Sequence, residues 1–328
     1  MEIRIFSPDC LFRGICDRVI RFSATEEFAG AGSFSLRVPI SEGSRFVPEA
    51  LIIPDGMPET FVVESVRADS AAGICDIGGR GILSFFSRRA LTDKITFAGS
   101  AEELLTDLAS VWGSAVLPGP LSTLSTGSAA QVNIGLGHRT LLSGMKDIAA
   151  EAGVGLRLQF MPGEGGFIFS LWEYRRGGVI LSRELGNLTG MKHAADFSRY
   201  LNRIHVAGNG GHVVSVSAAG LFDDGIDDAS QPLREGWENA EDLAMERYGT
   251  EAEYRAALAA RGRRILAQRR PKITVSAETD EKTAFLLRPG DICPIRGETL
   301  AAEAVCMGKS VLYDGESLHY SASLSLRG

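Results

Sequence analysis

The sequence predicts a multidomain chain of mixed β and α+β structure, with a small antiparallel β-barrel domain at each end and helix-bearing segments between them. Three observations lead to this fold class. Apolar and polar residues alternate in short runs near both termini, a pattern typical of strands with one buried face. Two helical apolar stripes lie within residues 100–152, and a strongly charged helix is predicted at 250–270.

The clearest strand pattern is at residues 33–40, where Phe34, Leu36 and Val38 alternate with polar residues. A second apolar segment, 21–28, precedes it, and a glycine-rich link over 29–32 joins the two. Glycine supplies the positive φ of a tight or bulged turn, so a β-hairpin is predicted. Pro39 has no N–H to donate, so the second strand ends there or lies at a sheet edge.

Residues 1–95 form the first predicted domain. Further short apolar runs are separated by links of roughly 4 to 10 residues, spacing that favours a small antiparallel barrel or sandwich. The predicted strands are 3–5, 11–15, 51–53, 61–66, 74–77 and 82–86.

Residues 96–190 form a predicted α+β domain. Ser100 and Glu103 have the spacing of a capping box, and the following leucine stripe ends at Gly113. A second helix is predicted at 141–152, ending at Gly153, and a hairpin of strands 156–160 and 167–172 follows.

Residues 191–222 contain three predicted strands, at 191–197, 202–206 and 212–216. The segment 223–271 is an acidic linker and helical insertion: 223–253 holds eleven acidic and two basic residues, whereas 255–272 holds seven basic and none acidic. Thr250 and Glu253 form a predicted capping box, and Pro271 ends the helix. This charge pattern has two interpretations, a solvated helix matched to its own dipole or a charged interface to a neighbouring subunit.

Residues 272–328 return to strands and predict a second barrel, together with 200–217. The predicted strands are 272–277, 285–287, 292–295, 302–307 and 318–326. The last has the most regular alternation, with Leu318, Tyr320 and Leu324 on one face.

Composition excludes several classes of protein. No apolar run of the 328 residues approaches the ~20 residues of a membrane helix, and the N-terminus lacks the pattern of a signal peptide. A formal charge of −7 argues against general affinity for DNA. The cysteines are odd in number and scattered, so small buried thiols are expected. They are Cys10, Cys16, Cys75, Cys293 and Cys306.

No motif points to a catalytic, cofactor or metal site. The five histidines (His138, His193, His205, His212 and His319) are isolated in the sequence. The acidic run 223–228 lacks EF-hand spacing, so a hydrated loop is favoured over a calcium site. No nucleophile motif of a known hydrolase is present, although paired carboxylates leave hydrolysis open. The expectation is a protein that is not an enzyme and holds no cofactor.

Several motifs, taken in order, resemble a known family. They are Gly30-x-Gly32-x-Phe34-x-Leu36-x-Val38-Pro39, Gly78-Gly79-Arg80-Gly81 with Ser87-Arg88-Arg89, Asn202-Arg203-Ile204-His205-Val206-Ala207-Gly208, and Pro289-Gly290-Asp291. This order is similar to that in the hub proteins of phage and prophage tail tips, or baseplates, a siphophage family that includes the N-terminal hub region of tail-associated lysins.

The resemblance implies two similar barrels per subunit and a ring, most often a trimer, that joins the tail tube to the tip and lets DNA pass. It implies the distal tail protein and the tape-measure protein as partners, DNA only in transit, and a place in the virion tail after assembly in the bacterial cytoplasm. It also makes 191–222 a junction between domains. Expected interface residues are Arg80, Arg88, Arg89, Asn202 and Arg203.

Two other functions stay open. One is a tail-tip module that binds host-surface carbohydrate, for which exposed aromatic residues such as Trp172, Tyr174 and Trp237 would matter. The other is a peptidoglycan hydrolase, because some tip hubs of the resembled family carry cell-wall-cleaving domains.

Overall fold

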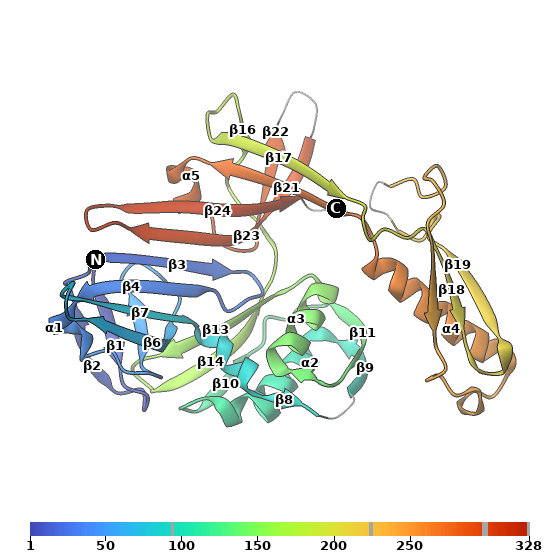
Figure 1. Cartoon of the computed structure of the whole chain (residues 1–328), viewed down its shortest axis with the longest axis horizontal. Coiled ribbons are helices and arrows are strands. Elements are labelled where there is room, and N and C mark those ends of the chain that lie inside the picture. The colour runs from blue at the N-terminus through green and yellow to red at the C-terminus, as the bar shows by residue number, and fades with distance from the viewer. Residues whose placement is uncertain (93–94, 223–225, 297–300, 327–328) are drawn as a thin grey trace. The chain divides into compact units, whose positions relative to one another are not determined.

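The computed structural model describes residues 1–92, 95–222, 226–296 and 301–326, and the chain forms two compact units (Figure 1). Unit 1 comprises Met1–Met191 and Ala277–Ser325, and unit 2 comprises Lys192–Ser276 with Leu326. Each unit is described by itself. The five cysteines are buried and form no disulfide, in agreement with the sequence. No helix in the described residues is long and apolar enough to cross a membrane.

A twelve-stranded mixed sheet organises unit 1, in the order β15-β22-β23-β3-β4-β7-β6-β5-β1-β2, with β16 paired to β22 and β24 to β23. The strands are β1 (Ile3–Phe6), β2 (Phe12–Cys16), β3 (Arg21–Glu27), β4 (Ser33–Pro39), β5 (Leu51–Pro54), β6 (Phe61–Asp69), β7 (Ile74–Gly81), β15 (Arg175–Arg176), β16 (Leu181–Ser182), β22 (Asp291–Arg296), β23 (Ala301–Tyr313) and β24 (Leu318–Leu326).

The sheet corrects the prediction of two barrels. β3, from the N-terminal segment, pairs antiparallel with β23, from the C-terminal segment, and Thr25 lies opposite Ser310. Among the described residues the strand path stays open, and no closed barrel is found. Alternation predicted the buried face of each strand, but it does not specify which strand lies alongside.

The β3–β4 hairpin is confirmed, and β4 ends at Pro39 as predicted. Gly32 has a φ of +60°, and a Cβ there would lie 2.1 Å from the Thr25 carbonyl oxygen. Gly79 on the neighbouring β7 is equally constrained, because a Cβ would lie 1.9 Å from the Val62 carbonyl oxygen. The glycines of the two N-terminal motifs therefore allow a close approach of backbones.

Unit 1 has two apolar cores, one against the large sheet and one within a layer of helices and short strands. α3 (Leu141–Ala152) ends at Gly153 in the left-handed region, and Ser100 caps α2 (Ala101–Asp107), both as predicted. The other elements of this layer are η2 (Leu108–Gly113, a π-helix), η3 (Ser114–Val116), β8 (Ala90–Leu91), β9 (Ile95–Ser100), β10 (Leu121–Leu124), β11 (Gln131–Leu136), β12 (Arg139–Thr140), β13 (Gly155–Met161) and β14 (Gly166–Trp172). β13 and β14 form the predicted hairpin. A short helix, α1 (Ile40–Gly43), follows β4.

Two strand predictions in unit 1 are wrong. Residues 82–86 lie in the 3-10 helix η1 (Ile82–Arg88), and residues 285–286 lie in α5 (Glu281–Leu286), where Asp280 caps the N-terminus. Residues 82–86 are all buried, and a short apolar run of that kind fits a helix or a strand equally well. In α5 the cap and not the apolar pair decided the structure.

Phe28 joins three parts of unit 1. Its N–H donates to the Met307 carbonyl, and its own carbonyl accepts from Leu156 N–H at 3.0 Å. Its ring stacks on Tyr174, with centroids 4.7 Å apart. Two glycines make room for it, since a Cβ on Gly155 would lie 2.4 Å from the Phe28 carbonyl oxygen and one on Gly290 would lie 2.6 Å from the ring. This contact explains the glycine of the Pro-Gly-Asp motif.

Unit 2 is a three-stranded sheet, in the order β19-β18-β20, packed on one long helix. Its elements are β18 (Arg203–Ala207), η4 (Asn209–Gly211), β19 (Val213–Ser217), β20 (Glu235–Asn239), η5 (Met245–Arg247) and α4 (Glu251–Gln268). β20 runs parallel to β18. Gly262 lets α4 approach the sheet, because a Cβ would lie 2.7 Å from Val216. The chain enters and leaves unit 2 through the paired strands β17 (Leu188–Asp196) and β21 (Lys272–Thr279).

Candidate interaction site

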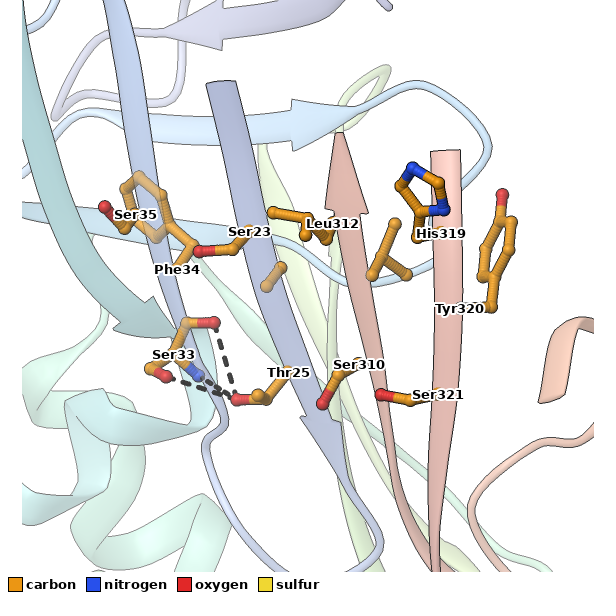
Figure 2. Close-up of a pocket in the computed structure, with 12 residues that line it drawn as sticks. Ser23, Thr25, Ser33, Phe34, Ser35, Ser310, Leu312, His319, Tyr320 and Ser321 are labelled. Carbon is orange, nitrogen blue, oxygen red and sulfur yellow. Dashed lines mark hydrogen bonds between the residues drawn. The ribbon is translucent and has the colours of Figure 1, made fainter. Parts of the chain in front are cut away.

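A shallow groove of about 400 Å³ lies on the face of the large sheet that is opposite its core. Figure 2 shows hydroxyl side chains from the β3–β4 hairpin beside those of β23 and β24. These positions alternate with the core-facing Phe22 and Leu36, so the period of the strands places them here. Thr25 and Ser33 are bonded to each other, and Ser33 N–H donates to Thr25 Oγ1 at 2.9 Å. The hydroxyl-bearing lining residues are Ser23, Thr25, Ser33, Ser35, Ser310, Tyr320 and Ser321.

A second groove, of about 390 Å³, lies between α5 and β24. Its apolar wall includes Phe285 and Leu286, which are 56% and 63% exposed. Glu281 on α5 accepts a hydrogen bond of 3.2 Å from the Tyr320 N–H, so the helix covers part of the β24 edge. Covering an edge with a helix limits uncontrolled strand pairing.

A serine, a histidine and a glutamate meet between the two grooves. Ser317 Oγ lies 3.0 Å from His319 Nε2, and His319 Nδ1 lies 3.1 Å from Glu281 Oε1. The spacing is that of a catalytic triad. However, Asp314 Oδ2 lies 3.2 Å from the same Nε2. Nε2 therefore faces a carboxylate oxygen as well as the Ser317 hydroxyl, whereas the base of a triad directs this nitrogen at the serine alone. Through these contacts His319 links Glu281 on α5 to Asp314 and Ser317 in the β23–β24 turn.

The three predicted interface arginines in unit 1 have partners within the chain. Arg80 makes an ion pair of 2.6 Å with Glu64, and Arg88 one of 2.5 Å with Glu49. The guanidinium carbon of Arg89 lies 5.2 Å from the Trp112 ring centroid. All three are partly exposed, and ion pairs of this kind exchange partners at little energetic cost.

Asn202 and Arg203, the other predicted interface residues, lie side by side in unit 2. The buried Asn202 side chain accepts from Arg234 N–H at 2.8 Å and donates to the Pro232 carbonyl at 3.1 Å. These bonds hold the segment that begins β20 against β18. Arg203 is exposed and lies 3.2 Å from Glu235.

Sequence reasoning missed a buried polar cluster in unit 2. Arg270 and Asp228 form an ion pair of 2.6 Å, with side chains 13% and 2% exposed. The Tyr200 hydroxyl donates to the same carboxylate oxygen at 2.5 Å. Burial, together with this hydrogen bond, raises the pKa of Tyr200 to about 12. The acidic run offered a signal, but Asp228 is 42 residues from Arg270 in sequence, so nothing local paired them.

The acidic and basic parts of 223–272 form some of their ion pairs with each other inside unit 2. α4 begins with the complete predicted capping box of Thr250 and Glu253. Arg261 on α4 binds Glu238 at 2.6 Å and Asp242 at 2.5 Å. Within the described ranges, no three His, Cys, Asp or Glu residues gather as they would around a metal ion. Residues 223–225 of the acidic run lie outside those ranges.

Two carboxyl groups of unit 1 with raised pKa values, Glu59 and Glu26, also escaped sequence analysis. Burial and the nearby Glu26 carboxylate raise the pKa of Glu59 to about 8, although Arg157 opposes the rise. Burial likewise raises the pKa of Glu26, against the opposing effect of Lys309.

Three solved structures share this architecture over 99% of the chain. A tail protein from Neisseria meningitidis MC58 is 14% identical, with 96% of that chain covered and a TM-score of 0.62. A 43 kDa tail protein of prophage MuSo2 from Shewanella oneidensis is 14% identical, with 98% covered and a TM-score of 0.61. A chain of the phage P2 baseplate in its activated conformation is 12% identical, with 98% covered and a TM-score of 0.51.

The chain has the fold of phage tail proteins. No protein-family model matches the sequence, and no curated protein matches it. The likeness is therefore one of structure and not of sequence, and at these identities it establishes the fold.

The three aromatic residues that sequence nominated for carbohydrate binding differ in the structure. Tyr174 stacks on Phe28, and the guanidinium carbon of Arg157 lies 4.8 Å from the Trp172 ring centroid, so both rings are half-buried. Trp237 on β20 is 65% exposed. It alone of the three presents an open ring face.

Proposed function

We propose that the chain is a structural hub of a phage or prophage tail tip, or baseplate, and not an enzyme. In this role three copies form a ring that joins the tail tube to the tip and leaves a central passage for DNA. Its neighbours are further copies of itself, the distal tail protein and the tape-measure protein. It is assembled in the bacterial cytoplasm and becomes part of the virion tail.

The observation that carries this proposal is the fold shared with tail proteins over 99% of the chain. The likeness to a chain of the P2 baseplate supports a position at the end of the tail. The formal charge of −7 supports a passage through which DNA moves without binding.

The open sheet of unit 1 supports self-association. Among the described strands, β2 ends the path at one side, and β24 branches from β23 near the other end, which is β15. Apolar side chains are exposed at both, including Phe12 on β2 and Leu318 on β24. Unlike surfaces at the two ends of one sheet suit head-to-tail contacts, which close into a ring when the rotation permits.

We also propose that exposed arginines contribute to the contact between subunits. Arg80, Arg88 and Arg89 are exposed, and the carboxylate partners of Arg80 and Arg88 are exposed residues of the same chain. Asn202 contributes indirectly, by holding β20 in place.

Immunogold electron microscopy of virions from the source phage or prophage tests the proposal. Antibody against the chain is expected at the tail tip alone, with antibody against a capsid protein as control. Label along the tube, on the head or absent from particles would contradict it. Zymography on peptidoglycan is expected to show no clearing, and clearing by the purified chain would instead support a hydrolase.

A further inference from the structure

Unit 2 presents an outer sheet face that the packing on α4 does not use. Ile204, Val206 and Val216 point toward α4 and form the core. Because strand residues alternate, the positions between them lie on the opposite face. There Ser215, His205 and Trp237 lie in register across β19, β18 and β20, and Arg203 lies opposite Glu235 in the adjacent row.

Hydrogen bonds hold this face in one arrangement. His205 Nδ1 lies 2.8 Å from Ser215 Oγ, and His205 Nε2 lies 3.3 Å from Glu235 Oε1. The same oxygen accepts from Arg203 Nη1 at 3.2 Å. The network spans all three strands, so its side chains lose little further freedom when a ligand binds.

The exposed ring of Trp237 adjoins this network. Its centroid lies 6.0 Å from that of His205, with 34° between the ring planes. Its nearest neighbours on this face are hydrogen-bonding groups, His205 in register and Glu235 and Asn239 in the adjacent rows, and the apolar Ala207 and Val213 lie only in the Asn239 row. At the centre of a protein–protein interface, packed contacts usually surround such an anchor and exclude water. This surface is therefore a poor match for a protein partner.

The charges on this face limit the chemical class of the ligand further. The Arg203 guanidinium and the Glu235 carboxylate compensate each other at 3.2 Å. A nucleic acid or another polyanion would meet the carboxylate as well as the cation, and neutralisation of several phosphates needs more basic groups than this face has. A neutral ligand with many hydroxyl groups fits better, because each hydroxyl both donates and accepts. Within the described part of the chain, Glu235 Oε2 and the other N–H groups of Arg203 have no partner and are available for it.

We propose that this face of unit 2 binds a neutral saccharide. One pyranose ring lies with its C–H face on the Trp237 indole, and neighbouring hydroxyls accept from Arg203 and donate to Glu235. His205 positions Glu235 and does not itself need to touch the sugar.

Binding of neutral hexasaccharides to the full-length chain tests this. Isothermal titration calorimetry with cellohexaose, maltohexaose and hexa-N-acetylchitohexaose is expected to detect binding of at least one. Trp237→Ala is expected to weaken it more than 10-fold and Glu235→Gln about 10-fold. Trp172→Phe, which alters a half-buried tryptophan of unit 1, is the matched control and is expected to bind normally. Because Trp237 is exposed, its variant is expected to unfold at the same temperature as the parent chain.

Several results would overturn the saccharide site. The first is the absence of heat with all three sugars, and the second is equal sugar binding by the parent chain and Trp237→Ala. The third is a tail protein that binds the parent chain, fails to bind Trp237→Ala and is not displaced by any of the sugars. The experiment does not depend on ring formation. If the chain forms rings but binds no sugar, the saccharide site alone is rejected. If the chain binds sugar but stays monomeric, the ring alone is rejected.

Discussion

Each of the two units joins its own distant segments in a different way. At the centre of unit 1, Phe28 joins distant segments through shape, with Gly155 and Gly290 making room for it. In unit 2, Tyr200, Asp228 and Arg270 join distant segments through a buried hydrogen-bonded ion pair. A joint fixed by shape is sensitive to added volume, whereas a joint fixed by charge is sensitive to loss of a partner and to pH.

The largest effect is expected from breaking the charged joint. Asp228→Asn removes the carboxylate that balances the nearly buried Arg270, and it should destabilise unit 2 by about 3 kcal/mol. Hydrogen exchange of α4 amides at increasing urea concentrations measures this change. Glu241→Gln, the same change at an exposed position, should have almost no effect. An equal effect of both substitutions would show that the buried pair has no special role.

The next effect comes from adding volume at the joint fixed by shape. Gly155→Ala places a Cβ against the Phe28 carbonyl and should destabilise unit 1 by about 2 to 3 kcal/mol. Gly163→Ala is a matched control in the turn of the same hairpin, where no atom lies within 4 Å of the added Cβ. Urea unfolding followed by circular dichroism compares the two. If Gly155→Ala were as stable as the control, the close fit around Phe28 would be disproved.

A pH-dependent effect is also expected in unit 1. The pKa of Glu59 is raised to about 8, so the folded chain binds more protons than the unfolded chain between the ordinary glutamate pKa and about 8. Stability of unit 1 should therefore fall as pH rises through that window. Thermal unfolding of the parent and of Glu59→Gln at pH 5.5 and 8.5 tests this. The variant should lose less stability over the interval, and identical slopes would contradict the assignment.

The smallest effect concerns Tyr200 at alkaline pH. Its folded pKa of about 12 lies above the ordinary tyrosine value, so stability of unit 2 should fall between pH 10 and 12 as the unfolded chain releases the phenolic proton first. Tyr200→Phe should cost about 1 kcal/mol at neutral pH by loss of one hydrogen bond. It should also reduce the alkaline fall in α4 protection. An unchanged alkaline profile would show that Tyr200 does not cause the fall.

Sequence predicted the features whose causes are local. The β3–β4 hairpin follows from alternation and a glycine link, α3 ends where Gly153 permits it, and α4 begins at a capping box. Each signal lies within a few residues of its consequence.

Features that depend on distant partners were not predictable. Nothing in β3 specifies β23 as its neighbour, and this pairing replaces the two expected barrels with one sheet. β20 was missed because its five residues, Glu-Gly-Trp-Glu-Asn, show no alternation of apolar and polar side chains, and Asn202, which is distant in sequence, fixes its position. Trp237 could be nominated from the sequence, but only the register of β18 and β20 places it beside His205 and Glu235.

The central claim, that copies of this chain assemble into the ring of a tail tip, is tested most directly by the mass of the purified full-length protein in solution. Mass photometry over a range of concentrations is expected to show a species about three times the 35.1 kDa of one chain, with ring-shaped particles in negative-stain electron microscopy. A single 35.1 kDa species at every concentration, including in the presence of the distal tail protein, would contradict it.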